Sequence, residues 1–473
     1  MCPLWPIHLF ILYLFLLCPL WFLCTGVASA AAAFQANFIP ENIKKLEEGA
    51  QQIINFTVPD ISDLGFQPKQ LDVITADCQI AQVVGNKTFY IAPSDVPENI
   101  SFILTGLFLG HTTVKIRASD DEKTAEAPSK TAYSEVLSVS VIRPWRTIDN
   151  VFIISVAVLV GLNYINMGCS LDLDIVKATL KKPIGPAVGL VSQFLFMPLM
   201  SFALAHIIFT SPNMRLGLFT LGCSPGGGAS NMWTYLLGGN LNLSITMTFL
   251  SNAMAFAAMP LWLFTLGRQI FDSSKINIPY TNITSSLVVL VLPVGIGLIF
   301  QRYFPKISTF CRRLLGPCSL FMILFIVIFG IFANLYMFKI FTWQVALGGL
   351  GVAWLGYIFG ALLAKIFRFS LEDIIAISIE TGVQNTGIAI VLLRFSLPQP
   401  DADLTSVIPV ASAIMMPIPL VTILIIFRIR RWIKEKNKSS YDMYDQSGST
   451  TPDSNKMLES STEPAYIKIG NGV

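Results

Sequence analysis

The feature that most constrains the fold is a series of nine apolar segments, each near the length of a helix that crosses a bilayer. Only 13% of the 473 residues are charged, and 53% are hydrophobic, whereas a soluble chain carries about a quarter charged residues. We therefore expect a polytopic all-α membrane domain over residues 149–430. The nine predicted spans are residues 149–168, 184–209, 214–238, 241–267, 283–301, 315–337, 342–364, 371–396 and 403–428.

The distribution of basic residues predicts the orientation in the membrane. Cytosolic connections carry an excess of Lys and Arg, and here alternate connections and the exit from the last span are basic. This pattern puts the N-terminus outside and the C-terminus in the cytosol. We expect the plasma membrane, with an endomembrane as the alternative, and the lack of a basic domain argues against nucleic-acid binding. The basic residues of the predicted cytosolic side are Lys177, Lys181, Lys182, Arg302, Lys306, Arg312, Arg313, Lys365, Arg368, Arg428, Arg430, Arg431, Lys434 and Lys436.

The segment before the first span is a separate, water-soluble region. Residues 1–30 contain no charged residue, and an apolar stretch before Ala28-Ser29-Ala30 predicts a cleaved signal peptide. Residues 31–146 alternate short apolar and polar runs between Gly, Pro, Asn and Asp, which is typical of a small antiparallel β-sandwich. We expect this region to be extracellular or lumenal, and an extracellular partner for it is left open. Glycosylation is predicted at Asn55, Asn86, Asn99 and Asn282.

The C-terminal end has the opposite character to the spans. The chain after Lys438 is rich in Ser, Thr, Asp and Pro and poor in large apolar residues. Such a composition cannot bury enough apolar surface to fold alone. Residues 431–473 are therefore expected to be a disordered cytosolic tail.

Two of the predicted spans are interrupted by polar residues and glycines. The segment from Gly222 to Asn231 contains a proline and three consecutive glycines, and the segment from Glu380 to Gly387 contains a carboxylate, two amides and two glycines. A charge at membrane depth is costly and is usually retained for function. Paired broken helices in two halves of a chain are the best sequence indication of a transporter site.

Packing offers a simpler explanation for several neighbouring polar residues. Ser244 and Thr248 are four apart and share a helix face, but Ser and Thr at this spacing more often pack helices together. Gln193, taken alone, is as well explained by a packing hydrogen bond. The uncompensated Glu380 and the two breaks together outweigh these explanations and favour an ion site.

Carboxylate, amide, hydroxyl and unwound-backbone oxygens suit a hard cation such as sodium. No soft-metal ligand spacing, no phosphate-binding loop and no nucleophile with its base is present in the sequence, so neither an enzyme nor an ATP-driven pump is indicated. No cofactor is expected beyond sodium as the coupling ion.

The two interrupted segments resemble those of the sodium/bile acid cotransporter family. The resemblance covers about residues 150–430, and the long N-terminal region is closer to orphan members. It implies a core domain and a panel domain, with two discontinuous helices that cross in the core. By resemblance, one sodium site uses Ser230, Asn231, Ser244, Thr248 and Glu380. A second uses Glu380, Thr381, Val383, Gln384 and Gln193, and Asn385 lies where the substrate meets the crossing.

These inferences lead to one main function and one alternative. The main expectation is sodium-coupled symport of a small amphipathic organic anion, such as a bile acid or sulfated steroid, across the lipid bilayer. The alternative is a non-transporting sensor that binds a partner through residues 31–146. The complete set of sodium ligands favours the symporter, because a sensor has no need of all of them.

Overall fold

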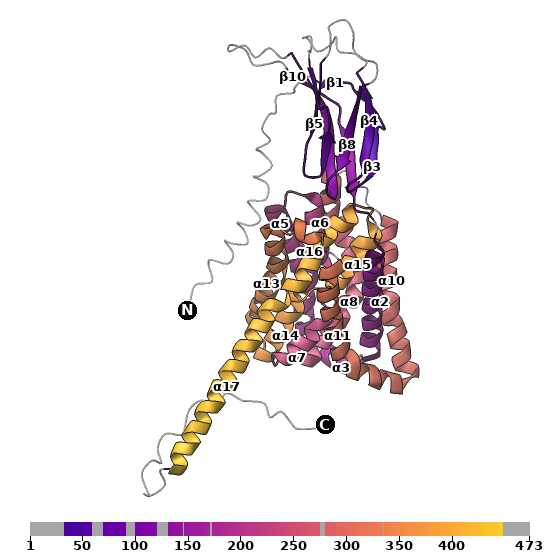
Figure 1. Ribbon diagram of the computed structural model, residues 1–473. Coiled ribbons are helices and arrows are strands. Elements are labelled where there is room, and N and C mark those ends of the chain that lie inside the picture. The colour runs from indigo at the N-terminus through magenta and orange to yellow at the C-terminus, as the bar shows by residue number, and fades with distance from the viewer. Residues whose placement is uncertain are drawn as a thin grey trace.

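The computed structural model describes residues 33–58, 70–90, 100–120, 131–144, 146–170, 173–274, 280–333 and 335–447. Within them a β-rich region precedes a bundle of helices (Figure 1). The predicted signal peptide, the Asn99 sequon and residues 448–473 lie outside the described residues.

The β-rich region consists of two sheets. One has the strand order β1-β10-β9-β11-β3, with β5 and β7 continuing from the other edge of β9, and the other has the order β2-β4-β8-β6. The strands are β1 (Ala33–Phe34), β2 (Asn37–Ile39), β3 (Asn42–Glu47), β4 (Gln51–Thr57), β5 (Gln70–Thr75), β6 (Ala81–Val84), β7 (Thr88–Tyr90), β8 (Ile100–Gly106), β9 (Gly110–Ser119), β10 (Thr131–Ser134) and β11 (Leu137–Ile142).

Alternating side chains of both sheets form one core. In β8 and β9 every second residue is buried, as expected for strands with one solvated face. Phe56 and Leu104 of one sheet meet Leu71 and Ile116 of the other in a single apolar cluster. The region is thus a sandwich, with Asn55 and Asn86 exposed on its surface.

The expectation of a purely antiparallel sandwich is wrong at two pairs of strands. β1 pairs with β10, and β3 with β11, in parallel register. Antiparallel neighbours follow readily from short hairpins, but these pairs join the start of the region to its end. The relative direction of two such strands is set by the path of the chain between them, which the alternation of apolar and polar residues does not reveal.

The helical part begins directly after β11. Its elements are α2 (Thr147–Ser170), α3 (Leu173–Leu180), α4 (Ile184–Val191), the π-helical turn η3 (Ser192–Phe196), α5 (Met197–Ile208), α6 (Pro212–Cys223), α7 (Ala229–Leu236), α8 (Leu241–Phe264), α9 (Leu266–Ser274), α10 (Tyr280–Tyr303), α11 (Pro305–Ala333), α12 (Met337–Ile340), α13 (Trp343–Ile366), α14 (Leu371–Gly382), α15 (Thr386–Ser396), α16 (Asp401–Met415) and α17 (Pro417–Ser447).

Five helices among the described residues are long and apolar enough to cross a membrane. The other predicted spans coincide with α10, α11 and two helices that are each broken in two, so the nine-span topology stays a prediction. The five candidate spans are Thr147–Cys169, Ile184–Ile208, Leu241–Phe271, Trp343–Ile366 and Asp401–Arg430.

The helices pack in a way that surrounds the two broken ones. α2 lies against α10 and α11, while α6 packs on α5 and α16, and α14 packs on α13 and α8. The β-rich region covers one end of the bundle, which we name the outer end, and α17 extends beyond the opposite end (Figure 1).

The tail departs from expectation over its first part. Helix α17 runs to Ser447, so residues 431–447 are helical rather than disordered. This stretch contains Lys, Arg and Glu, which favour helices, and the first glycine after it is Gly448. A composition that cannot form a core can still continue an existing helix, because propagation needs no new nucleus.

Candidate functional site

The two interruptions predicted from the sequence are real breaks in the helices. Ser224 to Gly228 separate α6 from α7, and Val383 to Asn385 separate α14 from α15. Pro225 lacks a backbone N–H and cannot continue α6. Asn385 caps the second half-helix, since its side chain accepts a hydrogen bond from the Ile388 backbone N–H at 3.1 Å.

The two breaks cross each other and pair through their backbones. The Gly227 N–H donates to the Val383 carbonyl at 2.8 Å, and the Asn385 N–H donates to the Pro225 carbonyl at 2.9 Å. A β-bridge between Gly226 and Gln384 lies between them. The unwound backbone therefore satisfies its polar groups inside the protein, as non-helical backbone at membrane depth must.

Glycine is required where the two chains approach. A Cβ on Gly226 would collide with a carboxylate oxygen of Glu380, and a Cβ on Gly227 would lie 2.9 Å from the Gln384 carbonyl oxygen. Any side chain at either position would push the two breaks apart. The glycines thus bring the carboxylate to the crossing.

One carboxylate oxygen of Glu380 collects hydroxyl groups from two other helices. The Ser230 hydroxyl of α7 donates to Oε2 at 2.6 Å, and the Thr248 hydroxyl of α8 donates to it at 2.9 Å. Ser244 lies 3.5 Å from the same oxygen and 2.9 Å from Oδ1 of Asn231. The structure therefore brings together all five residues expected for the first sodium site.

This cluster has more acceptor oxygens than protons to share among them. Three hydroxyls can donate one proton each, yet Thr248 alone faces oxygens of Glu380, Asn231 and Ser230. Oε1 of Glu380 is buried and has no hydrogen-bond partner among the described residues. Glu380 is 1% exposed, so water does not replace that partner freely. A cation fits such an oxygen-rich, negatively charged cluster.

Three of the residues expected for the second sodium site, Gln193, Gln384 and Thr381, form a second hydrogen-bonded cluster at the crossing. The Gln193 amide donates to the Ser224 carbonyl at 2.7 Å and to Oε1 of Gln384 at 2.8 Å. The Gln384 amide donates to the Thr381 carbonyl at 2.8 Å. Glu380 was also expected here, but among the described residues it makes no hydrogen bond to either glutamine, and the two glutamines bond to each other and to backbone carbonyls.

Gln193 reaches the crossing from an irregular part of its helix. It belongs to η3, where the hydrogen bonding widens for one turn between α4 and α5. Such π-bulges are frequent at functional sites because they turn side chains out of the regular helical register. Here the bulge buries Gln193 against the break in α6 and α7.

Asn385 is held by a chain of polar side chains that was not predicted from the sequence. Its amide donates to the Tyr164 hydroxyl at 2.6 Å, and that hydroxyl donates to Oδ1 of Asn252 at 2.8 Å. The Asn252 amide in turn donates to the Thr248 carbonyl at 2.7 Å. Asn252 follows Ser244 and Thr248 at the same four-residue spacing, a signal that could have revealed it.

A small cavity of about 50 Å³ lies beside the crossing. Ligand pockets usually measure about 300–1,000 Å³, so a larger organic molecule needs the helices to move before it fits. The lining residues are Gly227, Gly228, Ala229, Trp233, Val383, Gln384, Asn385, Thr386, Gly387, Ala413, Met416 and Pro417.

The chemistry of the site is that of oxygen ligands alone. No group of three or more His, Cys, Asp or Glu residues that could hold a metal ion occurs in the part of the chain that the structure describes. Hydroxyl, amide, carbonyl and carboxylate oxygens suit a hard cation of low charge.

Comparison with known proteins points to one group of transporters. Residues 157–341 match the sequence model of the Sodium Bile acid symporter family. The chain is 30% identical to the hepatic sodium/bile acid cotransporter of Rattus norvegicus over 294 residues, which are 61% of this chain and 80% of that protein. It is 31% identical to the sodium-dependent organic anion transporter of Bos taurus over 261 residues, 54% of this chain and 67% of that protein.

The family match does not include the β-rich region, and a third relative is matched over about half its length. The chain is 30% identical to the P3 protein of Homo sapiens over 251 residues, which are 53% of each protein. The chain thus matches about half the length of the P3 proteins. The family match over residues 157–341 lies within the helical bundle and contains the first break, between α6 and α7, but ends before the second.

Proposed function

This chain belongs to the sodium bile acid symporter family, and we propose on that basis that it is a sodium-coupled symporter of a small amphipathic organic anion. It is an integral membrane protein with five apolar helices of spanning length in its described part. Two of the three relatives compared are named as a cotransporter or a transporter. The observation that carries the proposal is the buried Glu380 carboxylate at the crossing of two broken helices.

Sodium bound at Glu380 would hold together three helices that meet around its negative charge. Ser230 comes from α7, Thr248 from α8 and Glu380 from α14. A cation among their oxygens neutralises the carboxylate and pulls these helices together. The crossing is then stabilised in a form that accepts substrate, which makes transport depend on sodium.

A second sodium at Gln193 and Gln384 requires a rearrangement of their amides. In this state the Thr381 carbonyl accepts from the Gln384 amide, and the Val383 carbonyl accepts from Gly227. Rotation of the Gln384 side chain by half a turn would leave oxygens free to bind a cation. We therefore assign the first ion to the Glu380 cluster and the second to this one.

The substrate would bind beside the crossing, at the cavity lined by Asn385. The N-terminal ends of α7 and α15 both border this cavity, through Ala229 and Thr386. Half-helix N-termini carry partial positive charge and attract anions in transporters with broken helices. The organic-anion names of the relatives support the same substrate class.

The proposed topology has nine spans, an outer N-terminus and rocking of a core against a panel. Helix α3, which contains Lys177, lies at the end of the bundle opposite the β-rich region, and α17 extends beyond that end (Figure 1), which supports a cytosolic position for it. The membrane potential would add about 2.3 kcal/mol per charge per 100 mV to the driving force.

Uptake of radiolabelled bile salts and steroid sulfates, with sodium or with choline in its place, tests the proposal. Glu380→Gln should abolish sodium-dependent uptake at normal surface expression, because the carboxylate supplies the charge that holds the ion. Glu372→Gln is the matched control, because it is the same substitution at an exposed residue in the first turn of α14. Undiminished sodium-dependent uptake by Glu380→Gln would refute the mechanism.

A further inference from the structure

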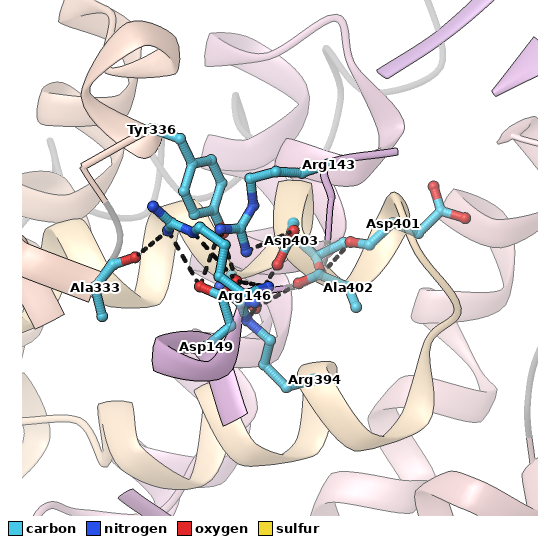
Figure 2. A network of polar contacts seen from close by, with 11 residues as sticks. Arg143, Arg146, Asp149, Ala333, Tyr336, Arg394, Asp401, Ala402 and Asp403 are labelled. Carbon is cyan, nitrogen blue, oxygen red and sulfur yellow. Dashed lines mark hydrogen bonds and ion pairs between the residues drawn. The ribbon is translucent and has the colours of Figure 1, made fainter. Parts of the chain in front are cut away.

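The β-rich region is joined to the outer end of the bundle by a network of charges that is buried except at Arg146 (Figure 2). The network contains three arginines and three aspartates, so their formal charges cancel. Its residues come from segments far apart in the sequence. They are Arg143, Arg146, Asp149, Arg394, Asp401 and Asp403.

Arg143 occupies the centre of this network. It directly follows β11, and its guanidinium lies 2.9 Å from the Asp149 carboxylate at the start of α2 and 3.5 Å from the Asp403 carboxylate of α16. The same group lies 4.0 Å above the ring of Tyr336. The Arg143 side chain is only 7% exposed, so water contributes little to balancing its charge.

The partners of Arg143 connect it to the crossing helix. Arg394 of α15 pairs with Asp403 and donates to the Tyr336 hydroxyl at 2.9 Å. Arg394 lies nine residues after Asn385 on a continuous helix, which is roughly 13 Å along its axis at 1.5 Å per residue. A displacement of α15 at the crossing is therefore transmitted to the network.

A second contact fixes the β-rich region to α16. Nε2 of His111 in β9 lies 2.7 Å from Oδ1 of Asp401, and the Asn213 amide of α6 donates to the same oxygen at 3.1 Å. The β-rich region thus holds α16 through His111 and Arg143 and holds α2 through Arg143. It connects α2, which packs on α10 and α11, with α16, which packs on α6, α13 and α15. These two groups of helices would separate at the outer end under the proposed rocking of a core against a panel.

We propose that Arg143 is a positioning residue for transport, which holds the outer ends of α2 and α16 together until the outer face opens. The inference rests on the proposed function, in that only a transporter needs this opening. The cavity at the crossing is too small for an organic anion, and the buried ion pairs of Arg143 resist the movement that would enlarge it. The β-rich region thereby sets how readily the site is reached from outside.

Labelling of a cysteine at the crossing measures the opening without any transport assay. Val160 of α2 is 2% exposed, and its side chain is the nearest group to Gly387 at the start of α15. Val160→Cys is made together with Cys78→Ser, which removes the exposed cysteine of the β-rich region. Intact cells are treated with a membrane-impermeant maleimide in choline, and the labelling rate is measured.

Removal of the Arg143 ion pairs should expose this cysteine more often. In Arg143→Gln we expect labelling roughly tenfold faster, within the usual range of coupling between sites. The labelling rate of Arg143→Lys should be intermediate, because lysine keeps the charge but lacks the planar guanidinium group that contacts two carboxylates. Arg117→Gln is the control, since Arg117 pairs with Asp72 at 2.6 Å inside the β-rich region, and its labelling should be unchanged.

The outcomes separate this inference from the proposed function. If Arg143→Gln is labelled at the parent rate, the inference is wrong, whatever the uptake assay shows. If the parent shows no sodium-dependent uptake, only the proposed function is wrong. Asp149→Asn removes the same bridge from the side of α2 and should also label faster. If neither variant reaches the cell surface, the bridge serves folding alone and the inference is wrong.

Discussion

The crossing of the broken helices and the network at the outer end are both buried and polar, but their charges are balanced differently. The Glu380 carboxylate contacts hydroxyl groups, and it forms no ion pair among the described residues. At the outer end, Arg394 pairs with Asp403, and Arg143 contacts Asp149 and Asp403.

This difference distinguishes a binding site from a structural connection. A buried charge without a counter-charge is costly, and a cation that binds there recovers the cost as binding free energy. A balanced network gains nothing from an added ion, but loses much when one partner is removed. The three predictions that follow test this contrast, starting from the largest expected effect.

Asp403→Asn should produce the largest loss of stability. It removes the carboxylate that faces both Arg394 and Arg143 and leaves an excess of positive charge among buried groups, and breaking a buried ion pair costs about 3–5 kcal/mol in comparable cases. Denaturation of the purified protein in detergent measures this loss, with Glu372→Gln as an exposed control that should change stability by less than about 1 kcal/mol. A loss as small as that of the control would show that the network is not balanced by Asp403.

Glu380→Gln should behave in the opposite way in the absence of sodium. Because it removes an uncompensated buried charge, the free energy of unfolding in choline should stay the same or rise. The parent protein should gain about 2.7 kcal/mol at a sodium concentration of 100 times the Kd, and the variant should lose this gain. A loss of several kcal/mol in choline would mean that the carboxylate is a structural group.

The smallest effect is expected from the hydroxyl of Thr248. Thr248→Val keeps the shape but removes a donor to Glu380, and a hydrogen bond to a charged group contributes about 1.5–3 kcal/mol. Sodium affinity, measured by thermal stabilisation, should fall roughly tenfold. Thr246→Val is the matched control on α8, because the Thr246 hydroxyl donates to the Asn242 carbonyl of the same helix. Equal shifts in both variants would exclude Thr248 as a sodium ligand.

The position of the candidate site could be predicted because it depends on local chemistry. A proline with three glycines and a carboxylate among apolar residues are visible in any single stretch of chain, and both stretches are broken helices in the structure. That the two broken helices cross was inferred only by resemblance, and their pairing through Gly226 and Gln384 came from the structure. The role of Tyr164 was missed, because one tyrosine in an apolar helix has no pattern that indicates a partner.

The amino-acid sequence by itself determined the apolar spans, the two breaks, the alternation of the β-rich region and the presence of an unbalanced Glu380. These follow from periodicity and from the cost of charge in an apolar segment, which act over a few residues. Only the tertiary structure decided the parallel pairing of β1 with β10 and of β3 with β11. It also decided the contact of Arg143 with Asp403, which lies 260 residues later in the chain. Such contacts depend on the whole path of the chain, and no local property of an arginine specifies which carboxylate it will meet.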